Sequence, residues 1–469
     1  MANPISAKMR VKNIYFNALN FLESKLNQGQ ERSVKAKKNI VAEIFLKGTS
    51  IAISLILVPL TINYISVSQY GIWLTLSSIV GWFVFFDIGL TQGLRNKFAE
   101  ALAKGDSELA QIYVSTTYAI LTIIFTILWI GFLIVNHFLN WAHILNVSEN
   151  MRSEVTTLAI IIFTYFCIQF VLNVISTIIT ADQQPAKGSL IGVVGQVLSL
   201  IFIIILVKTT DGSLIKLGLA LCVSPIIVYF TANFILFKGT YKKYKPRFSK
   251  IKFSYTKGLF NLGIIFFIIQ IAGIIQYQTA NIIIAQNFST SDVTSYNIVY
   301  KYFGILNMAF TIFLTPFWSA STEAYLKNDI QWIKNSIKKY NLLNILLIIA
   351  GIIMLVFAEE IYTLWLGKGT VSIPFSLSLW GFIFFNISIF GGKYIFFLNG
   401  ISALRIQFWA SVFSPILYIA VAILLIKYYH FGVYALFIAS VVANFNGLIL
   451  APIQYHMVIN KKKKGIWIR

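Results

Sequence analysis

Charged residues are scarce in this sequence. Only 12% of its 469 residues are Asp, Glu, Lys or Arg, and 16 acidic residues stand against 38 basic ones. Because 58% of the residues are hydrophobic, too few polar side chains are present to cover a soluble globule of this length. The composition argues against a soluble enzyme or binding protein. It predicts an all-α polytopic membrane protein.

Cysteines, histidines and nucleotide-binding motifs are also few or missing. Cys167 and Cys222 both fall within apolar runs, which predicts free thiols and no disulfide framework. The four histidines are scattered and form no metal-binding spacing. The G-K-G-T at 367–370 lacks the spacing of a P-loop. We therefore expect no metal, no cofactor and no catalytic residue. The first 40 residues also lack the apolar core of a cleavable signal peptide.

Long apolar runs are what the chain has in abundance. Each is long enough to cross a hydrocarbon layer of about 30 Å at a rise of about 1.5 Å per residue. We predict about twelve transmembrane spans, at 44–65, 70–92, 111–135, 155–180, 189–208, 214–237, 258–285, 295–320, 341–358, 375–398, 407–426 and 433–458.

The basic residues follow the order of these spans. Most fall in the N-terminal segment, in every second connection and at the C-terminus. Because Lys and Arg concentrate on the cytoplasmic side of membrane proteins, both termini are predicted to be cytoplasmic. Membrane orientation accounts for the formal net charge of +22, so no nucleic-acid partner is expected. The segment 11–26 fits either an interfacial helix or a disordered basic tail.

A polar motif at the end of span two recurs 223 residues later. Glu100, Ala101, Lys104 and Asp106 align with Glu323, Ala324, Lys327 and Asp329. The repeat predicts two six-helix halves of the same topology, with a site at their interface. The predicted division is a basic N-terminal segment at 1–43, a first half at 44–237, a basic linker at 238–257, a second half at 258–459 and a basic tail at 460–469.

Three segments carry a family resemblance. The stretch 87–106 (DIGLTQGLRNKFAEALAKGD) resembles the cytoplasmic exit of helix two in the polysaccharide-repeat (O-antigen) flippases. The basic linker and the segment 399–406 (NGISALRI) are also similar. That family belongs to the multidrug/oligosaccharidyl-lipid/polysaccharide (MOP) exporter superfamily. The resemblance covers nearly the whole chain in topology.

The resemblance implies a fold, a substrate and partners. It implies a V-shaped twelve-helix protein that moves undecaprenyl-diphosphate-linked oligosaccharide across the bacterial inner membrane by alternating access. The implied partners are that lipid-linked oligosaccharide and the membrane lipids. A glycan polymerase and other assembly proteins are further candidates.

Such transport needs a cationic place for the diphosphate, and ionisable residues within spans are the first candidates. For the lysines the alternative is that they snorkel to the membrane surface. For the residues after span two the alternative is a role as orientation anchors. The candidate cations are Lys301, Lys393, Lys47, Arg95 and Lys97. Asp87 is the one acid well inside a span, and it could pair with a cation as a gate or bind a coupling ion.

Two polar stripes on apolar helices are candidates for sugar binding. Their members are spaced so that each set shares one helical face. Hydrogen bonding between helices is the alternative reading. The first stripe is Gln169, Asn173 and Thr177, and the second is Gln270, Tyr277 and Asn281.

Two other functions compete with the flippase. A cation-coupled multidrug antiporter of the same superfamily would normally carry acids in spans one or seven, whereas the intramembrane charges here are mostly cationic. A membrane glycan polymerase would need a large extracytoplasmic loop, and the predicted loops are short. Coupling to protons, coupling to sodium and uncoupled transport all remain open.

Overall fold

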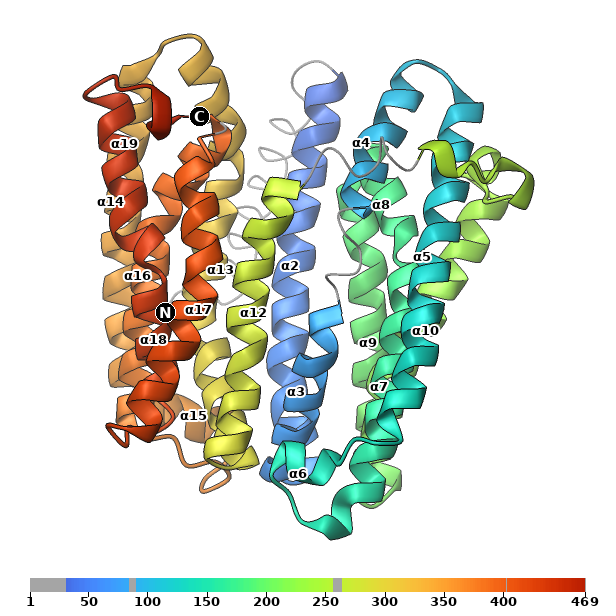
Figure 1. The fold of residues 1–469 in the computed structure, drawn as a ribbon, viewed down its shortest axis with the longest axis vertical. Helices are drawn as coiled ribbons and strands as arrows, with labels where there is room; N and C mark the ends of the chain where they lie inside the picture. The colour runs from blue at the N-terminus through green and yellow to red at the C-terminus, as the bar shows by residue number, and fades with distance from the viewer. Residues whose placement is uncertain (1–30, 84–89, 256–263, 402, 469) are drawn as a thin grey trace, which may run out of the picture.

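The computed structural model describes residues 31–83, 90–255, 264–401 and 403–468. Within these ranges the regular structure is helical (Figure 1). Nine helices there are long and apolar enough to cross a membrane, and the bent pair Ala435–Ala443 and Asn446–Ile459 makes a tenth. Helices α3 (Val67–Gly81) and α12 (Ile264–Asn287) occupy the two other predicted spans, each beside a range that is not described. The prediction of an all-α polytopic fold is confirmed. The segment 11–26 lies outside the described residues.

The helices form two bundles (Figure 1). The N-terminal bundle contains α2 (Glu31–Tyr64), α3, α4 (Leu90–Ala103), α5 (Ser107–Asn136), α6 (Trp141–Leu145), α7 (Arg152–Leu172), α8 (Val174–Ala181), α9 (Pro185–Thr209) and α10 (Leu214–Lys238). The C-terminal bundle contains α12, α13 (Thr290–Leu326), α14 (Ile330–Val356), α15 (Ala358–Leu366), α16 (Phe375–Gly400), α17 (Arg405–Lys427), α18 (Ala435–Ala443), η6 (Asn446–Leu450) and α19 (Ala451–Ile459).

The repeated motif forms the same turn in both halves. After α4 the chain turns at Gly105, with φ of 70°, and the amide of Asp106 donates to the Ala101 carbonyl at 3.0 Å. After α13 it turns at Asn328, with φ of 57°, and the amide of Asp329 donates to the Ala324 carbonyl at 2.8 Å. Both turns are left-handed helix ends closed by a backbone hydrogen bond.

The aspartate of each motif then begins the next helix. Asp106 accepts a hydrogen bond from the Leu109 amide at 2.9 Å, and Asp329 accepts one from the Trp332 amide at 3.0 Å. A side-chain carboxylate at this position satisfies an amide that would otherwise lack a partner. The sequence repeat therefore encodes a helix stop followed by a helix start.

A second repeat lies at the opposite ends of α3 and α13. Ser66 and Gln69 exchange side-chain to backbone hydrogen bonds of 3.1 Å before α3. Ser289 and Asp292 make the same exchange before α13, also at 3.1 Å. Such reciprocal bonds form a capping box. These caps have the same 223-residue spacing as the first repeat, which supports two halves of one topology.

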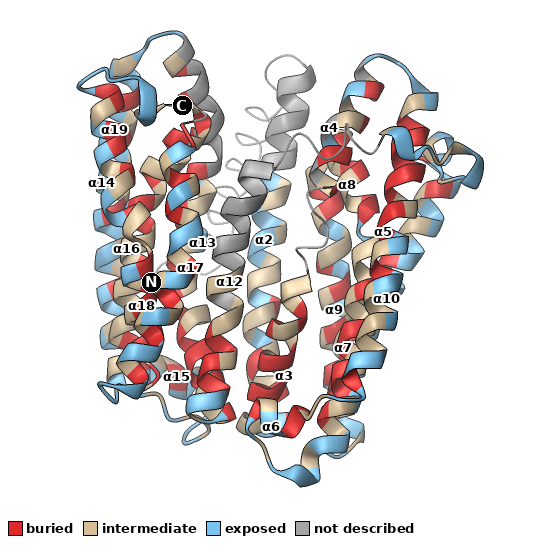
Figure 2. Cartoon of the chain, in the orientation of Figure 1, coloured by how far each residue is buried: buried red, intermediate tan, exposed pale blue. Residues whose placement is uncertain are grey.

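The two bundles meet mainly at one end. Helix α3 packs on α12 and α13, α6 contacts α12, and α2 contacts α15. The bundles separate toward the end where α4 and α19 lie (Figure 1). The contacting part of α3 is buried (Figure 2). A Cβ atom on Gly71 would lie 1.7 Å from the Thr290 carbonyl oxygen, so only glycine permits this approach of α3 to α13.

Candidate functional site at the junction of the halves

Side chains at the start of α3 and of α13 form a hydrogen-bonded seam between the halves. The hydroxyls of Ser68 and Thr290 are 2.6 Å apart, and the Thr294 hydroxyl donates to the Val67 carbonyl at 2.8 Å. Farther around the same junction, Trp365 donates its indole N–H to the Leu55 carbonyl at 2.8 Å. We call these contacts the junction seam. They join the two halves where α3 of the first half packs on α12 and α13 of the second.

Lys301 lies directly beside this seam. Its ammonium group donates to the Tyr70 hydroxyl at 3.3 Å, which joins α13 of one half to α3 of the other. The Tyr70 side chain is buried and Lys301 is partly exposed. The sequence predicted a cation close to the interface, and the structure places Lys301 there. Its role in binding diphosphate remains a prediction.

Asn281 links three helices next to Lys301. Its amide donates to the Ser78 hydroxyl at 2.6 Å, and its carbonyl oxygen accepts from Asn297 at 2.8 Å. Both asparagines are 2% exposed, so these bonds are shielded from water and hold α3, α12 and α13 together. The contacts correspond to the alternative of hydrogen bonding between helices. A sugar-binding role for Asn281 remains a prediction.

Lys393 is enclosed within the C-terminal half. Its side chain is fully buried, and the ammonium group donates to the Asn344 side chain and, at 3.0 Å, to the Phe390 carbonyl. The rings of Phe390 and Tyr394 lie 4.2 and 4.9 Å from the nitrogen. An ammonium group with these partners does not snorkel to a membrane surface in this conformation. A diphosphate could reach it only after a rearrangement of α14 and α16.

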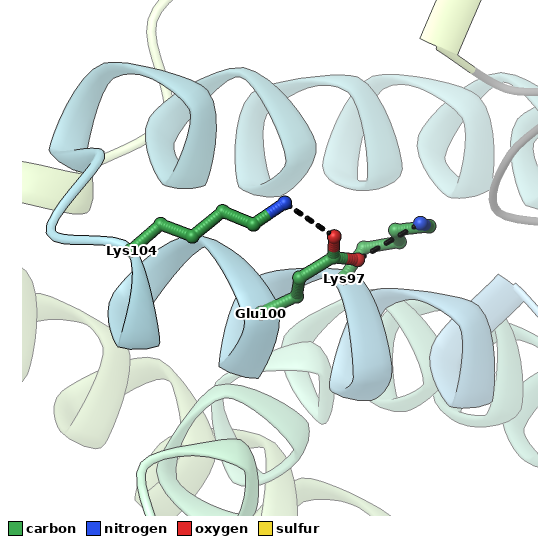
Figure 3. Close-up of polar contacts among 3 residues, drawn as sticks. All are labelled: Lys97, Glu100 and Lys104. Carbon is green, nitrogen blue, oxygen red and sulfur yellow. Dashed lines mark hydrogen bonds and ion pairs between the residues drawn. The ribbon is translucent and has the colours of Figure 1, made fainter.

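The candidates on α4 differ in their surroundings. Arg95 is exposed. Lys97 forms an ion pair with Glu100 at 2.9 Å, and Lys104 pairs with the other carboxylate oxygen at 2.7 Å (Figure 3). The hydrogen bond from Lys104 has the largest effect on the carboxyl group, and that from Lys97 the next. Together they lower the pKa of Glu100 to about 2. The bond to Glu100 also raises the pKa of Lys97. Glu100 therefore braces α4, and it pairs with Lys97, one of the proposed phosphate-binding cations.

Replacement of Glu100 by Gln should have little effect on stability at neutral pH, because exposed ion pairs contribute little. The small difference from wild type should be fully present above the ordinary carboxyl pKa of 4.5 and should disappear as the pH falls toward about 2. Thermal unfolding of wild type and Glu100→Gln between pH 7 and pH 3 measures the difference in stability. A difference that grows on acidification would contradict the assignment.

The other candidates are distributed over several helices. Lys47 is exposed on α2. The first polar stripe runs from α7 into α8, and the exposed Asn173 between them has helical backbone angles. Gln169 and Thr177 are half-buried. The stripe therefore lies along one membrane span, Glu149–Ala181, and its role in sugar binding remains a prediction. Asp87 lies outside the described residues, as do the side chains of Gln270 and Tyr277 on α12.

An uncharged cavity in the C-terminal half escaped the sequence analysis. It has a volume of about 390 Å³ and lies among α12, α13, α16, α17, α18 and η6. Tyr296, Tyr300 and Gln407 are among its lining residues. Gln407 could have been noticed as an amide in an apolar run, which is the signal used for the stripes. Its neighbours on other helices could not have been identified, because no spacing in the sequence connects them.

The fold is similar to that of solved transporter structures. No protein-family model matches the chain. The inward-facing structure of a multidrug resistance MATE transporter of the MOP superfamily superposes with a TM-score of 0.70 at 15% identity, covering 86% of this chain and 96% of the other. An outward-facing structure of such a transporter gives 0.60 at 14% identity, covering 92% and 97%. The chain has the MOP-superfamily fold.

Curated sequences narrow the resemblance within MOP-fold proteins. An O-antigen export protein of Yersinia pseudotuberculosis is 25% identical over 372 residues, covering 77% of this chain and 82% of the relative. An O-antigen transporter of Salmonella typhi is 23% identical over 300 residues, covering 63% and 66%. The predicted resemblance to the O-antigen transporters of the MOP superfamily is confirmed. Together with the apolar helices, it identifies a multi-pass protein of the bacterial inner membrane.

Proposed function

We propose that the protein is a flippase that moves undecaprenyl-diphosphate-linked oligosaccharide repeat units across the inner membrane by alternating access, for synthesis of O-antigen, capsule or exopolysaccharide. The observation that carries the proposal is its similarity, over most of its length, to proteins named as O-antigen transporters. Flipping breaks and forms no covalent bond, so the protein needs no catalytic residue, and the relatives are named for transport and export.

The one-sided contact between the halves supports alternating access. The predicted orientation puts the start of α3 on the extracytoplasmic side, so the junction seam would close that side and leave the cytoplasmic side open. A substrate made in the cytoplasmic leaflet could then enter between the halves. Release on the other side would require the seam to open. Its hydrogen bonds join uncharged groups and each contributes little to stability, so the binding energy of the substrate can offset their loss.

The charge at the junction favours an anionic substrate. The side-chain hydrogen bonds described between α3 and α13 include one cation, Lys301, whereas the nearby carboxylate of Asp292 bonds to Ser289 within its own half. A diphosphate group is attracted to such a cation, whereas a cationic drug is repelled by it. This charge favours the flippase over the multidrug antiporter. Coupling to protons or sodium, and contacts with a glycan polymerase or assembly proteins, remain separate questions.

Deletion of the gene tests the proposal. We expect lipid-linked oligosaccharide to accumulate in the inner leaflet of the deleted strain and to return to its ordinary level when the wild-type gene is restored. Export of surface glycan at the ordinary rate, combined with new sensitivity to cationic drugs, would instead identify the antiporter.

A further inference from the structure

The cavity in the C-terminal half has polar and aromatic walls but no charge. Among the described residues that line it, none is acidic or basic. Its volume of about 390 Å³ falls within the range of roughly 300–1,000 Å³ that is typical of sites for small molecules. An anion would require a cationic partner and a cation would require a carboxylate. The cavity therefore suits a neutral ligand.

One wall of the cavity presents hydrogen-bonding groups from α17. Gln407, Ser411 and Ser414 line the cavity at helical spacings that put them on one face. Gln407 is 7% exposed, and its carbonyl oxygen has no hydrogen-bond partner among the described residues. A buried amide oxygen without a partner is uncommon, because the loss of hydration is not compensated. Because Gln407 lines the cavity, a small turn of its side chain would bring this oxygen to a ligand hydroxyl, which would supply the missing donor.

The facing walls combine further polar groups with aromatic rings. Asn444, at the end of α18, donates to the Ser388 hydroxyl at 3.4 Å, and both residues line the cavity. Tyr296 lines it from α13 and stacks on Phe437 with a centroid distance of 4.6 Å. Aromatic faces offer a rigid apolar surface beside polar groups. Hydroxyls and amides that both donate and accept suit a ligand rich in hydroxyl groups.

The backbone of α16 approaches the bent last span closely beside the cavity. The last span bends by 44° between Ala435–Ala443 and Asn446–Ile459. The segment Asn446–Leu450 is a π-helix, a form often found at functional sites. A Cβ atom on Gly391 would lie 2.6 Å from the Cα of Gly447. The two glycines thus let α16 pack directly against the bend, which holds Asn444 and Asn446 at the cavity.

From these features we infer that the cavity of the C-terminal half is a binding site for neutral sugar units, separate from the cation that would receive the diphosphate. The inference rests on the proposed function and specifies where the glycan part of its substrate is held. Gln407 supplies an acceptor for a sugar hydroxyl, and the seryl and asparaginyl groups exchange further hydrogen bonds. The partly exposed ring of Tyr300 packs against the apolar face of a sugar.

Binding measurements on the full-length protein in nanodiscs test the site. The ligands are undecaprenyl diphosphate and the oligosaccharide released by mild acid from the lipid-linked pool of the gene-deleted strain. We expect Gln407→Leu to weaken oligosaccharide binding about five- to tenfold, the effect of one lost hydrogen bond. Affinity for undecaprenyl diphosphate should not change. Ser411→Ala should also weaken oligosaccharide binding, by a smaller factor than Gln407→Leu.

The matched control is Gln196→Leu. Gln196 lies on α9 in the N-terminal half, and its carbonyl oxygen also lacks a partner among the described residues, but it does not line the cavity. Its replacement should leave oligosaccharide affinity unchanged. No oligosaccharide binding by wild type, equal affinities for wild type and both cavity variants, or equal weakening of both ligands would overturn the site. Absence of a lipid-linked pool in the deleted strain would instead overturn the proposed function, and the site with it.

Discussion

A disulfide across the junction seam should stop transport. Ser68→Cys and Thr290→Cys, introduced together after replacement of Cys167 and Cys222 by alanine, place two thiols where two hydroxyls now lie 2.6 Å apart. A disulfide joins side chains whose Cβ atoms are roughly 3.5–4.5 Å apart, so this pair should oxidise readily. Since the seam must open to release substrate on the second side, flipping by the oxidised protein should fall to background.

Reduction of the same protein provides the control. Flipping should return when the disulfide is reduced, and each single cysteine variant should transport like the cysteine-free parent under oxidising conditions. The measurement is the rate of glycan translocation before and after addition of reductant, with the cross-link followed by gel mobility. Full transport by the fully cross-linked protein would show that these ends of α3 and α13 do not separate.

Replacement of Lys301 by Ala should slow flipping about tenfold to a hundredfold. A hydrogen bond to a charged group contributes about 1.5–3 kcal/mol, and about 1.4 kcal/mol corresponds to a factor of ten. Lys301→Ala removes the cation that we expect to attract the diphosphate, and it also removes the bond to Tyr70. Lys301→Arg should retain much of the rate, because it preserves the charge.

Two further variants separate these effects. Tyr70→Phe removes the hydroxyl partner but keeps the lysine, so it should slow flipping much less than Lys301→Ala. Lys208→Ala removes an exposed lysine at the end of α9 and should leave flipping unchanged. Translocation rates at equal amounts of membrane-inserted protein measure all four. A Tyr70→Phe effect as large as that of Lys301→Ala would assign Lys301 to closing the junction rather than to binding substrate.

The architecture could be predicted because the signals that specify it are local. Apolar runs determine where spans lie, and the motif ending in Asp106 and Asp329 determines where helices stop and start again. The bend in the last span could not be predicted in the same way. The bend of 44° after Ala443 occurs within a continuous apolar run, and the close approach of Gly391 on α16 to Gly447 at this bend joins residues far apart in the sequence.

The candidate site could be predicted only in part. Lys301 was found because a charge in a span is costly and therefore conspicuous. The partners of the two lysines could not be predicted in this way, because Tyr70 and Asn344 are brought to Lys301 and Lys393 by helices far away in sequence. The same reason explains why the uncharged cavity was missed. Its walls come from six segments, and an amide in an apolar run, such as that of Gln407, is the signal that the sequence alone makes visible.

The most direct test of the central claim is flipping by purified protein in proteoliposomes. Undecaprenyl-diphosphate oligosaccharide carrying a labelled sugar is placed in both leaflets, and a membrane-impermeant galactose oxidase or periodate treatment measures the fraction exposed outside. Vesicles with wild-type protein should expose the whole pool over time, whereas empty vesicles and vesicles with the oxidised Ser68→Cys/Thr290→Cys protein should expose only the outer half. An inner pool that stays protected in the presence of folded wild-type protein would contradict the account.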